Sequence, residues 1–196
     1  MLTLTHFKGH VSGGFGGSNK NIGIGCADGR IGKAEIHTVA GSDEQWSIKK
    51  EEFMERMTES TKSVLDHFEN RVTYINVMRN MSVNCDCDGK DAEPVVTPDV
   101  GILASTDILA VDSACVDVIY SLMAGGGDAM IERIESRHGH RQLTYMKELG
   151  MGNDCYTLID IDNDDKEICV EDVTENIEPE WIPDRFNIFF GRNKRR

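Results

Sequence analysis

The sequence contains no apolar run close to the roughly 20 residues that a helix needs to cross a bilayer. Its first residues also lack the basic start and the apolar stretch of a signal peptide. We therefore expect a soluble protein of the cytoplasm with no membrane partner. Hydrophobic residues nevertheless make up 39% of the 196 residues, which is enough to build the core of one domain.

Positive charge is scarce as well, because 21 basic residues stand against 34 acidic ones and the formal net charge is −13. Nucleic-acid binding depends on a basic surface that displaces counterions, so we expect no nucleic-acid partner. The one basic cluster, Arg192 with residues 194–196, is typical of a solvated tail. The six cysteines of a chain without a secretory signal are expected to be reduced, as metal ligands or core residues.

Intact nucleotide-binding and esterase motifs are missing too. In the glycine-rich segment 9–32, Gly14-x-Gly16 is followed by Asn19 where a dinucleotide fingerprint has its third glycine. Gly32-Lys33 is followed by Ala34, where a P-loop requires Ser or Thr. No Gly-x-Ser-x-Gly elbow occurs. Two interpretations stay open: a loop whose N–H groups and Lys20 hold an anion, or a tight packing loop.

Hydrophobic periodicity predicts strands that alternate with helices. Residues 2–7, 72–78 and 156–161 have strand patterns, and the last of these begins an acidic hairpin. The runs 100–104 and 108–111 predict short strand or turn segments. Helical spacing marks a helix that includes Phe53, Met57, Val64, Leu65 and Phe68, a second one capped by Asp112 or Ser113, and a third over residues 129–149.

This alternation predicts an α/β fold, a layered sheet of mixed or mostly parallel strands with flanking helices. We expect a single domain over residues 1–170. It would contain a glycine-rich loop at 9–32 and a Cys-Asp-Cys loop at 80–98. Residues 171–196 are expected to form a poorly packed C-terminal extension.

The sharpest chemical feature is Cys85-Asp86-Cys87. In an extended segment the two thiols face the same way, so both can reach one soft metal ion. Two ligands are too few, and Cys26, His6, His10 and His37 are the candidates for the others. The alternative is a pair of incidental thiols in a polar loop. Arg133, Arg137 and Arg141 surround His138-Gly139-His140, which favours a solvated helix junction there.

Several blocks of the chain together resemble a family of domains of unknown function, family 362. They are residues 6–10, 16–21, 23–26, 84–87, 98–105, 110–114 and 145–156, with Gly32, Lys33 and His37 between them. The resemblance extends over about residues 2–162. It implies an iron–sulfur-associated protein, of which this chain corresponds to the C-terminal half. It implies no reaction.

One departure from the family limits what can be bound. Many members carry a double ferredoxin module of repeated C-x-x-C-x-x-C-x-x-x-C-P, whereas this chain has the short connector 38–47 at that place. Two conventional four-iron clusters are excluded by the ligand count. A transition metal or a single iron–sulfur cluster stays open.

We derive three hypotheses. The first is a metal- or iron–sulfur-associated binding protein with Cys85, Cys87, Cys26 and His10 as ligands. The second is an enzyme that binds an anionic small molecule or cofactor through Lys20, Asn21, Gly23 and Gly25, with His10 or His37 as acid or base. The third is a non-catalytic remnant that self-associates. A small-molecule ligand, a redox partner or a second copy would be the partner.

Overall fold

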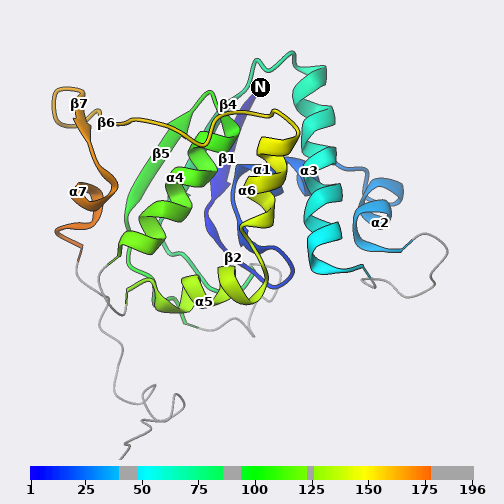
Figure 1. Cartoon of the computed structure of the whole chain (residues 1–196), viewed down its shortest axis with the longest axis horizontal. Coiled ribbons are helices and arrows are strands. Elements are labelled where there is room, and N and C mark those ends of the chain that lie inside the picture. Colours follow the sequence, from blue (N-terminus) through cyan, green and yellow to red (C-terminus); the bar gives the residue numbers. More distant parts are fainter. Residues whose placement is uncertain (40–47, 86–93, 123–125, 178–196) are drawn as a thin grey trace, which may run out of the picture.

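The structure, a computed structural model, describes residues 1–39, 48–85, 94–122 and 126–177. Its elements follow one another along the chain as Figure 1 shows. They are β1 (Leu2–His6), β2 (Lys8–His10), β3 (Gly14–Gly16), α1 (Ser18–Gly25), α2 (Ile31–His37), α3 (Lys50–His67), β4 (Thr73–Met78), β5 (Gly101–Ser105), α4 (Ile108–Ser121), α5 (Asp128–Ser136), α6 (Arg141–Glu148), β6 (Leu158–Asp160), β7 (Lys166–Ile168) and α7 (Val170–Thr174).

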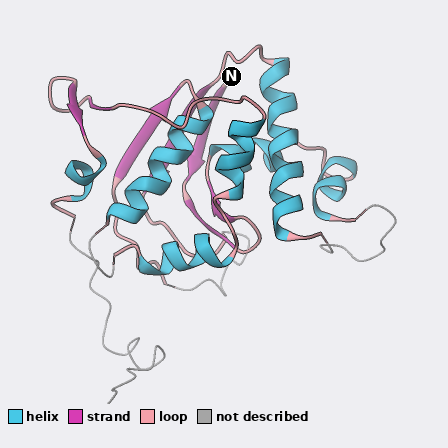
Figure 2. Ribbon diagram, viewed as in Figure 1, coloured by secondary structure: helices cyan, strands magenta, loops and turns pink. Residues whose placement is uncertain are grey.

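The largest sheet has the strand order β1-β4-β5 and mixes the two pairing modes, as expected from the sequence. Strands β1 and β4 are parallel, with Thr5 opposite Asn76, and β4 and β5 are antiparallel. Helices α1 and α4 lie against the face that carries Thr3, Thr5, Tyr74 and Asn76 (Figure 2). The chain is therefore an α/β protein with a layer of helices on one face of a mixed sheet.

The other face of this sheet is apolar and open. Leu2 and Leu4 of β1 are 66% and 68% exposed, and Ile102 of β5 is 65% exposed. Their cross-strand partners Ile75 and Val77 lie on the same face, because directly paired residues point to the same side. None of the described helices packs against this face.

Helix α3 packs against α1 through a close backbone approach. A Cβ atom on Gly23 would lie 2.4 Å from the carbonyl oxygen of Met57, so only glycine fits there. The hydroxyl of Ser60 donates to the carbonyl oxygen of Gly23 at 2.8 Å, and Thr61 donates to that of Asn19 at 2.8 Å. The apolar stripe of α3, including Phe53, was predicted by its helical spacing and is buried.

The structure differs from the sequence-based expectation in three places. Residues 9–32 are not a loop, because most of them belong to the β2–β3 hairpin and to helix α1. Residues 108–111 open helix α4, since Asp107 caps it by accepting the N–H of Ala110 at 3.0 Å. Residues 170–174 form α7, which packs on α4, while residues 178–196 lie outside the described part of the chain.

Within the described ranges, none of the helices is both long enough and apolar enough to cross a membrane. The acidic hairpin expected near residue 160 is present as the pair β6 and β7. Residues 137–140 form the expected junction between α5 and α6.

Candidate functional site

The start of helix α1 is closed by a buried carboxylate. Asp112 of α4 is fully buried, and its Oδ1 and Oδ2 accept the backbone N–H groups of Ser18 at 2.8 Å and Asn19 at 2.9 Å. Asn76 donates to Oδ1 at 2.8 Å. Burial raises the pKa of Asp112, and the three donors act against that rise. Asp112 therefore caps the N-terminus of α1, although it belongs to helix α4.

Gly17 explains why the glycine-rich motif is needed here. A Cβ atom at this position would lie 2.5 Å from Oδ1 of Asp112, so any side chain would push the carboxylate away. One interpretation of the sequence was that N–H groups of this segment bind an external anion. Those of Ser18 and Asn19 are instead hydrogen-bonded to Asp112. This part of the motif serves packing.

His10 is a neutral hydrogen-bond donor at the end of β2. Its Nδ1 accepts the backbone N–H groups of Ser12 at 3.3 Å and Gly13 at 3.1 Å, so the proton of the neutral ring is on Nε2. Burial lowers the pKa of His10 to about 3, and the nearby charge of Lys20 acts in the same direction. The ring stacks on Phe53 with the centroids 6.3 Å apart.

A cavity of about 200 Å³ beside Phe53 is lined by Val11, Ser12, His37, Ile48, Lys50, Phe53 and Arg137. We call it the cationic cavity, because Lys50 and Arg137 border it and no acidic side chain from the described ranges does. The Nε atom of Arg137 is buried and has no hydrogen-bond partner among the described residues. A buried guanidinium nitrogen without an acceptor is costly, and an anion would satisfy it.

Two further features make this region electropositive. Helix α3 begins at the cavity without a side-chain cap, so the positive end of its dipole faces this region. Lys20 lies close enough to lower the pKa of both His10 and His37. Burial is the main cause of the lowered pKa of His37, whose Nδ1 donates to the carbonyl oxygen of Lys33 at 2.7 Å. In the neutral ring of His37 the lone pair is then on Nε2.

Of the four predicted cofactor-binding residues, Lys20 alone is directed toward the two histidines. Asn21 ties α1 to β1 by donating to the hydroxyl of Thr5 at 2.9 Å. Gly23 serves the contact between α1 and α3, and Gly25 is exposed, where a Cβ atom would meet Oδ1 of Asn21 at an ordinary contact distance of 3.7 Å. Packing accounts for Asn21 and Gly23.

The predicted metal ligands are not brought together by the described residues. Cys26 is exposed at the end of α1, Cys85 is buried, and Cys87 lies outside the described residues. Over the described ranges, no group of three or more His, Cys, Asp or Glu side chains could hold a metal ion. Nδ1 of His10 accepts backbone N–H groups, so the proton of the neutral ring is on Nε2. Nε2 therefore has no lone pair for a metal ion.

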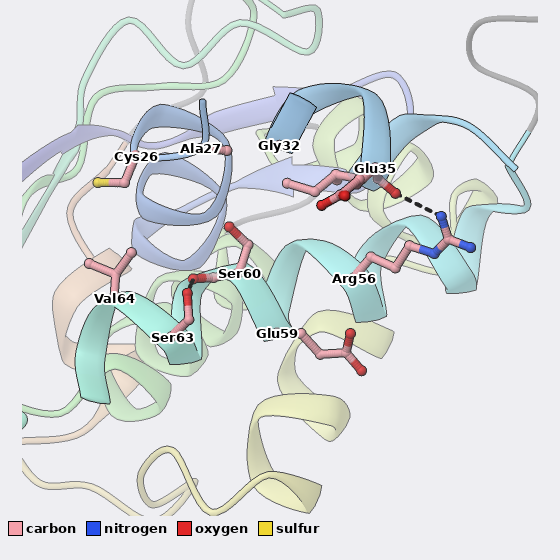
Figure 3. Close-up of a pocket in the computed structure, with 10 residues that line it drawn as sticks. Cys26, Ala27, Gly32, Glu35, Arg56, Glu59, Ser60, Ser63 and Val64 are labelled. Carbon is pink, nitrogen blue, oxygen red and sulfur yellow. Dashed lines mark hydrogen bonds between the residues drawn. The ribbon is translucent and has the colours of Figure 1, made fainter. Parts of the chain in front are cut away.

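Cys26 instead borders a wider hollow of about 500 Å³ between α1, α2 and α3, shown in Figure 3. Several of the polar groups there already have protein partners. Arg56 donates to the carbonyl oxygen of Glu35 at 2.7 Å, and Ser63 donates to that of Ser60 at 2.8 Å. The cationic cavity is therefore the better candidate for a ligand site, because the Nε atom of Arg137 has no hydrogen-bond partner among the described residues.

Sequence reasoning missed the residues that build this cavity. Arg137 was assigned to a solvated junction, Phe53 was predicted only as part of a helix, and Lys50 was not singled out. The one available signal was His37, which belongs to a motif and was already a candidate acid or base.

The chain matches the family described as Domain of unknown function (DUF362) over residues 1–117. The match spans more than half of the sequence, so the chain belongs to this family. It includes both Gly17 and Asp112, and two motif blocks that resemble the family therefore contact each other directly in the structure. No curated protein and no solved structure matches the chain.

Proposed function

We propose that the chain binds a small oxyanion, a carboxylate or phosphate group of a metabolite, in the cationic cavity. The observation that carries this proposal is the buried Nε of Arg137, which has no acceptor among the described residues, in a side chain that lines a cavity together with Lys50 and His37. Arginine pairs readily with planar carboxylates and with phosphates. The volume of about 200 Å³ favours a ligand of a few heavy atoms.

The chemistry that this arrangement supports is proton transfer. Arg137 and Lys50 would hold the anionic group, and His37, which lines the same cavity, would be the acid or base. His10, whose ring stacks on Phe53, would remain neutral beside Lys20 and so would not weaken the structure around the cavity. A cationic His10 would instead repel Lys20 and disturb the hairpin that forms one wall of the cavity.

The test compares anion binding by the parent chain, Arg137→Gln and Arg71→Gln. Arg71 is a matched control, because its side chain is 76% exposed and, among the described residues, forms an ion pair with Glu69 alone. Titration calorimetry with inorganic phosphate and, separately, with pyruvate at constant ionic strength distinguishes the two anion classes. Loss of a buried charge-assisted hydrogen bond should weaken binding about tenfold to a hundredfold in Arg137→Gln.

Arg71→Gln should bind like the parent. The proposal is wrong if the parent binds neither anion, or if both arginine variants weaken binding equally, since the second result would mean general screening. Lys20→Ala should weaken binding less than Arg137→Gln, because Lys20 acts only through its field.

A second proposal is a soft metal ion or single cluster at Cys85-Asp86-Cys87. Its support is the burial of Cys85 beside a fixed backbone: Gly9 donates to the carbonyl oxygen of Ser82 at 2.8 Å, and Arg133 donates to that of Val83 at 3.0 Å. Metal analysis of anaerobically purified protein should find metal in the parent and in Cys155→Ser, and little in Cys85→Ser. Equal metal content in all three proteins would refute it.

We also propose that the protein is located in the cytoplasm. The remaining alternative for its function is self-association through the open sheet face. Cell fractionation tests the first. Sedimentation of the purified chain tests the second, and a monomer at all accessible concentrations would exclude it.

A further inference from the structure

Apolar side chains are exposed both on the open face of the sheet and beside the edge strand β5. They include Leu2, Leu4 and Ile102 and, at the β6–β7 hairpin, Ile159 and Ile161, which are 49% and 79% exposed. Between β5 and this hairpin lies a groove of about 630 Å³, bordered by Ile102, Ile159 and Ile161 and by polar side chains that include Asp160, Asp162 and Lys166. We call this whole area the β5 surface. Exposed apolar areas of this kind mark binding sites for another chain segment.

The sequence offers a segment of matching chemistry. Residues 181–190 contain Trp181, Ile182, Phe186, Ile188, Phe189 and Phe190. The whole chain has only 7 phenylalanines and 2 tryptophans, so this short stretch is far richer in large apolar side chains than the rest. Phe186, Ile188 and Phe190 alternate with the period of a strand, which would turn all three toward one surface.

The path of the chain leads to the groove. Helix α7 contributes Val173 and Glu175 to the groove lining, and Ile177 packs against the same core cluster as Leu103 of β5. In Figure 1, α7 and the β6–β7 hairpin stand beside β5 at the edge of the sheet. Trp181 follows Ile177 by four residues, which span up to about 14 Å when extended. Neighbouring strands are only about 4.8 Å apart, so this reach is enough to round the edge.

We propose that residues 181–190 of the same chain dock on the β5 surface, with Trp181 in the groove and the alternating apolar side chains toward Ile102. A tethered segment has an effective concentration in the millimolar range, which favours it over a second copy at ordinary protein concentrations. The docked segment would cover the open apolar face and remove an edge that invites aggregation. This inference is independent of the proposed anion site.

The test uses Trp181 as a reporter in a chain that carries Trp46→Phe. Its fluorescence emission and its quenching by acrylamide are measured alone, with Ile102→Glu, and with the control Ile31→Glu. Ile31 is 68% exposed on α2 and is remote from the sheet. Ile102→Glu should increase the quenching constant several-fold and shift the emission to the red, while Ile31→Glu should change neither.

The docked state should persist unchanged over a wide range of protein dilution. A Trp181 that acrylamide quenches freely in the parent would overturn the proposal. So would protection that disappears on dilution together with a sedimenting dimer, because the occupant would then be a second copy. If Trp46→Phe fails to fold, hydrogen exchange of residues 181–190 in the natural sequence, with and without Ile102→Glu, decides the same question.

Discussion

Replacing Asp112 with asparagine should destabilise the fold severely. The carboxylate accepts three hydrogen bonds while fully buried, from Ser18, Asn19 and Asn76. An asparagine keeps one acceptor oxygen and turns an NH₂ group toward donors, so at least one N–H of helix α1 loses its partner. Hydrogen bonds to a charged group contribute about 1.5–3 kcal/mol each, and breaking such a buried cluster costs about 3–5 kcal/mol. We expect a loss in this range.

Urea unfolding at neutral pH, followed by far-UV circular dichroism, measures this loss, with an unchanged slope as the check of two-state behaviour. The control is Asp66→Asn, because Asp66 is 58% exposed and pairs with Lys62 on the surface of α3. That change should stay within about 0.5 kcal/mol of the parent. A loss below about 1 kcal/mol for Asp112→Asn would refute the reasoning, because it would mean that a neutral carboxyl group occupies this site.

Three further predictions concern stability. The unfolded chain protonates His10 near its ordinary pKa of 6.5 while the folded chain does so only near 3. Stability should therefore fall by about 2 kcal/mol between pH 7 and pH 5 in urea unfolding, and this part of the pH dependence should vanish in His10→Gln. Gly23→Ala should cost about 2–4 kcal/mol by thermal or urea unfolding, because its Cβ atom meets the backbone of α3, whereas Gly25→Ala should be neutral or slightly stabilising; equal effects would contradict the packing argument. Asp107→Ala should cost about 1–2 kcal/mol in the same assay through loss of the α4 cap, and an unchanged midpoint would show that the cap is dispensable.

The strands and the longer helices could be predicted because their hydrophobic periods are clear. The alternation in β1 predicts a strand, although Thr3 and Thr5 rather than the leucines face the helices, and α3 repeats its apolar residues at helical spacing. Helix α1 could not be predicted in this way, because its glycines oppose helix formation locally. Tertiary contacts override that preference, through Asp112 at its start and Met57 along its side.

The start of α4 was misread for a different reason. Residues 108–116 are all buried, since this helix lies between the sheet and other helices, so no polar face reveals its period. The candidate site was even less accessible to sequence reasoning. His37, Lys50 and Arg137 come from three helix ends far apart in the chain, and no local motif connects them.

The pairing of Ser18 with Asp112 joins positions that are 94 residues apart. During synthesis the ribosome adds Ser18 long before Asp112, the residue that caps helix α1. In a nascent chain that ends before α4, the N–H groups of Ser18 and Asn19 lack their acceptor, and Gly17 lacks the carboxylate against which it packs. We expect such nascent chains to stay open to chaperones and proteases until Asp112 leaves the exit tunnel, so folding of this protein is timed by one late residue.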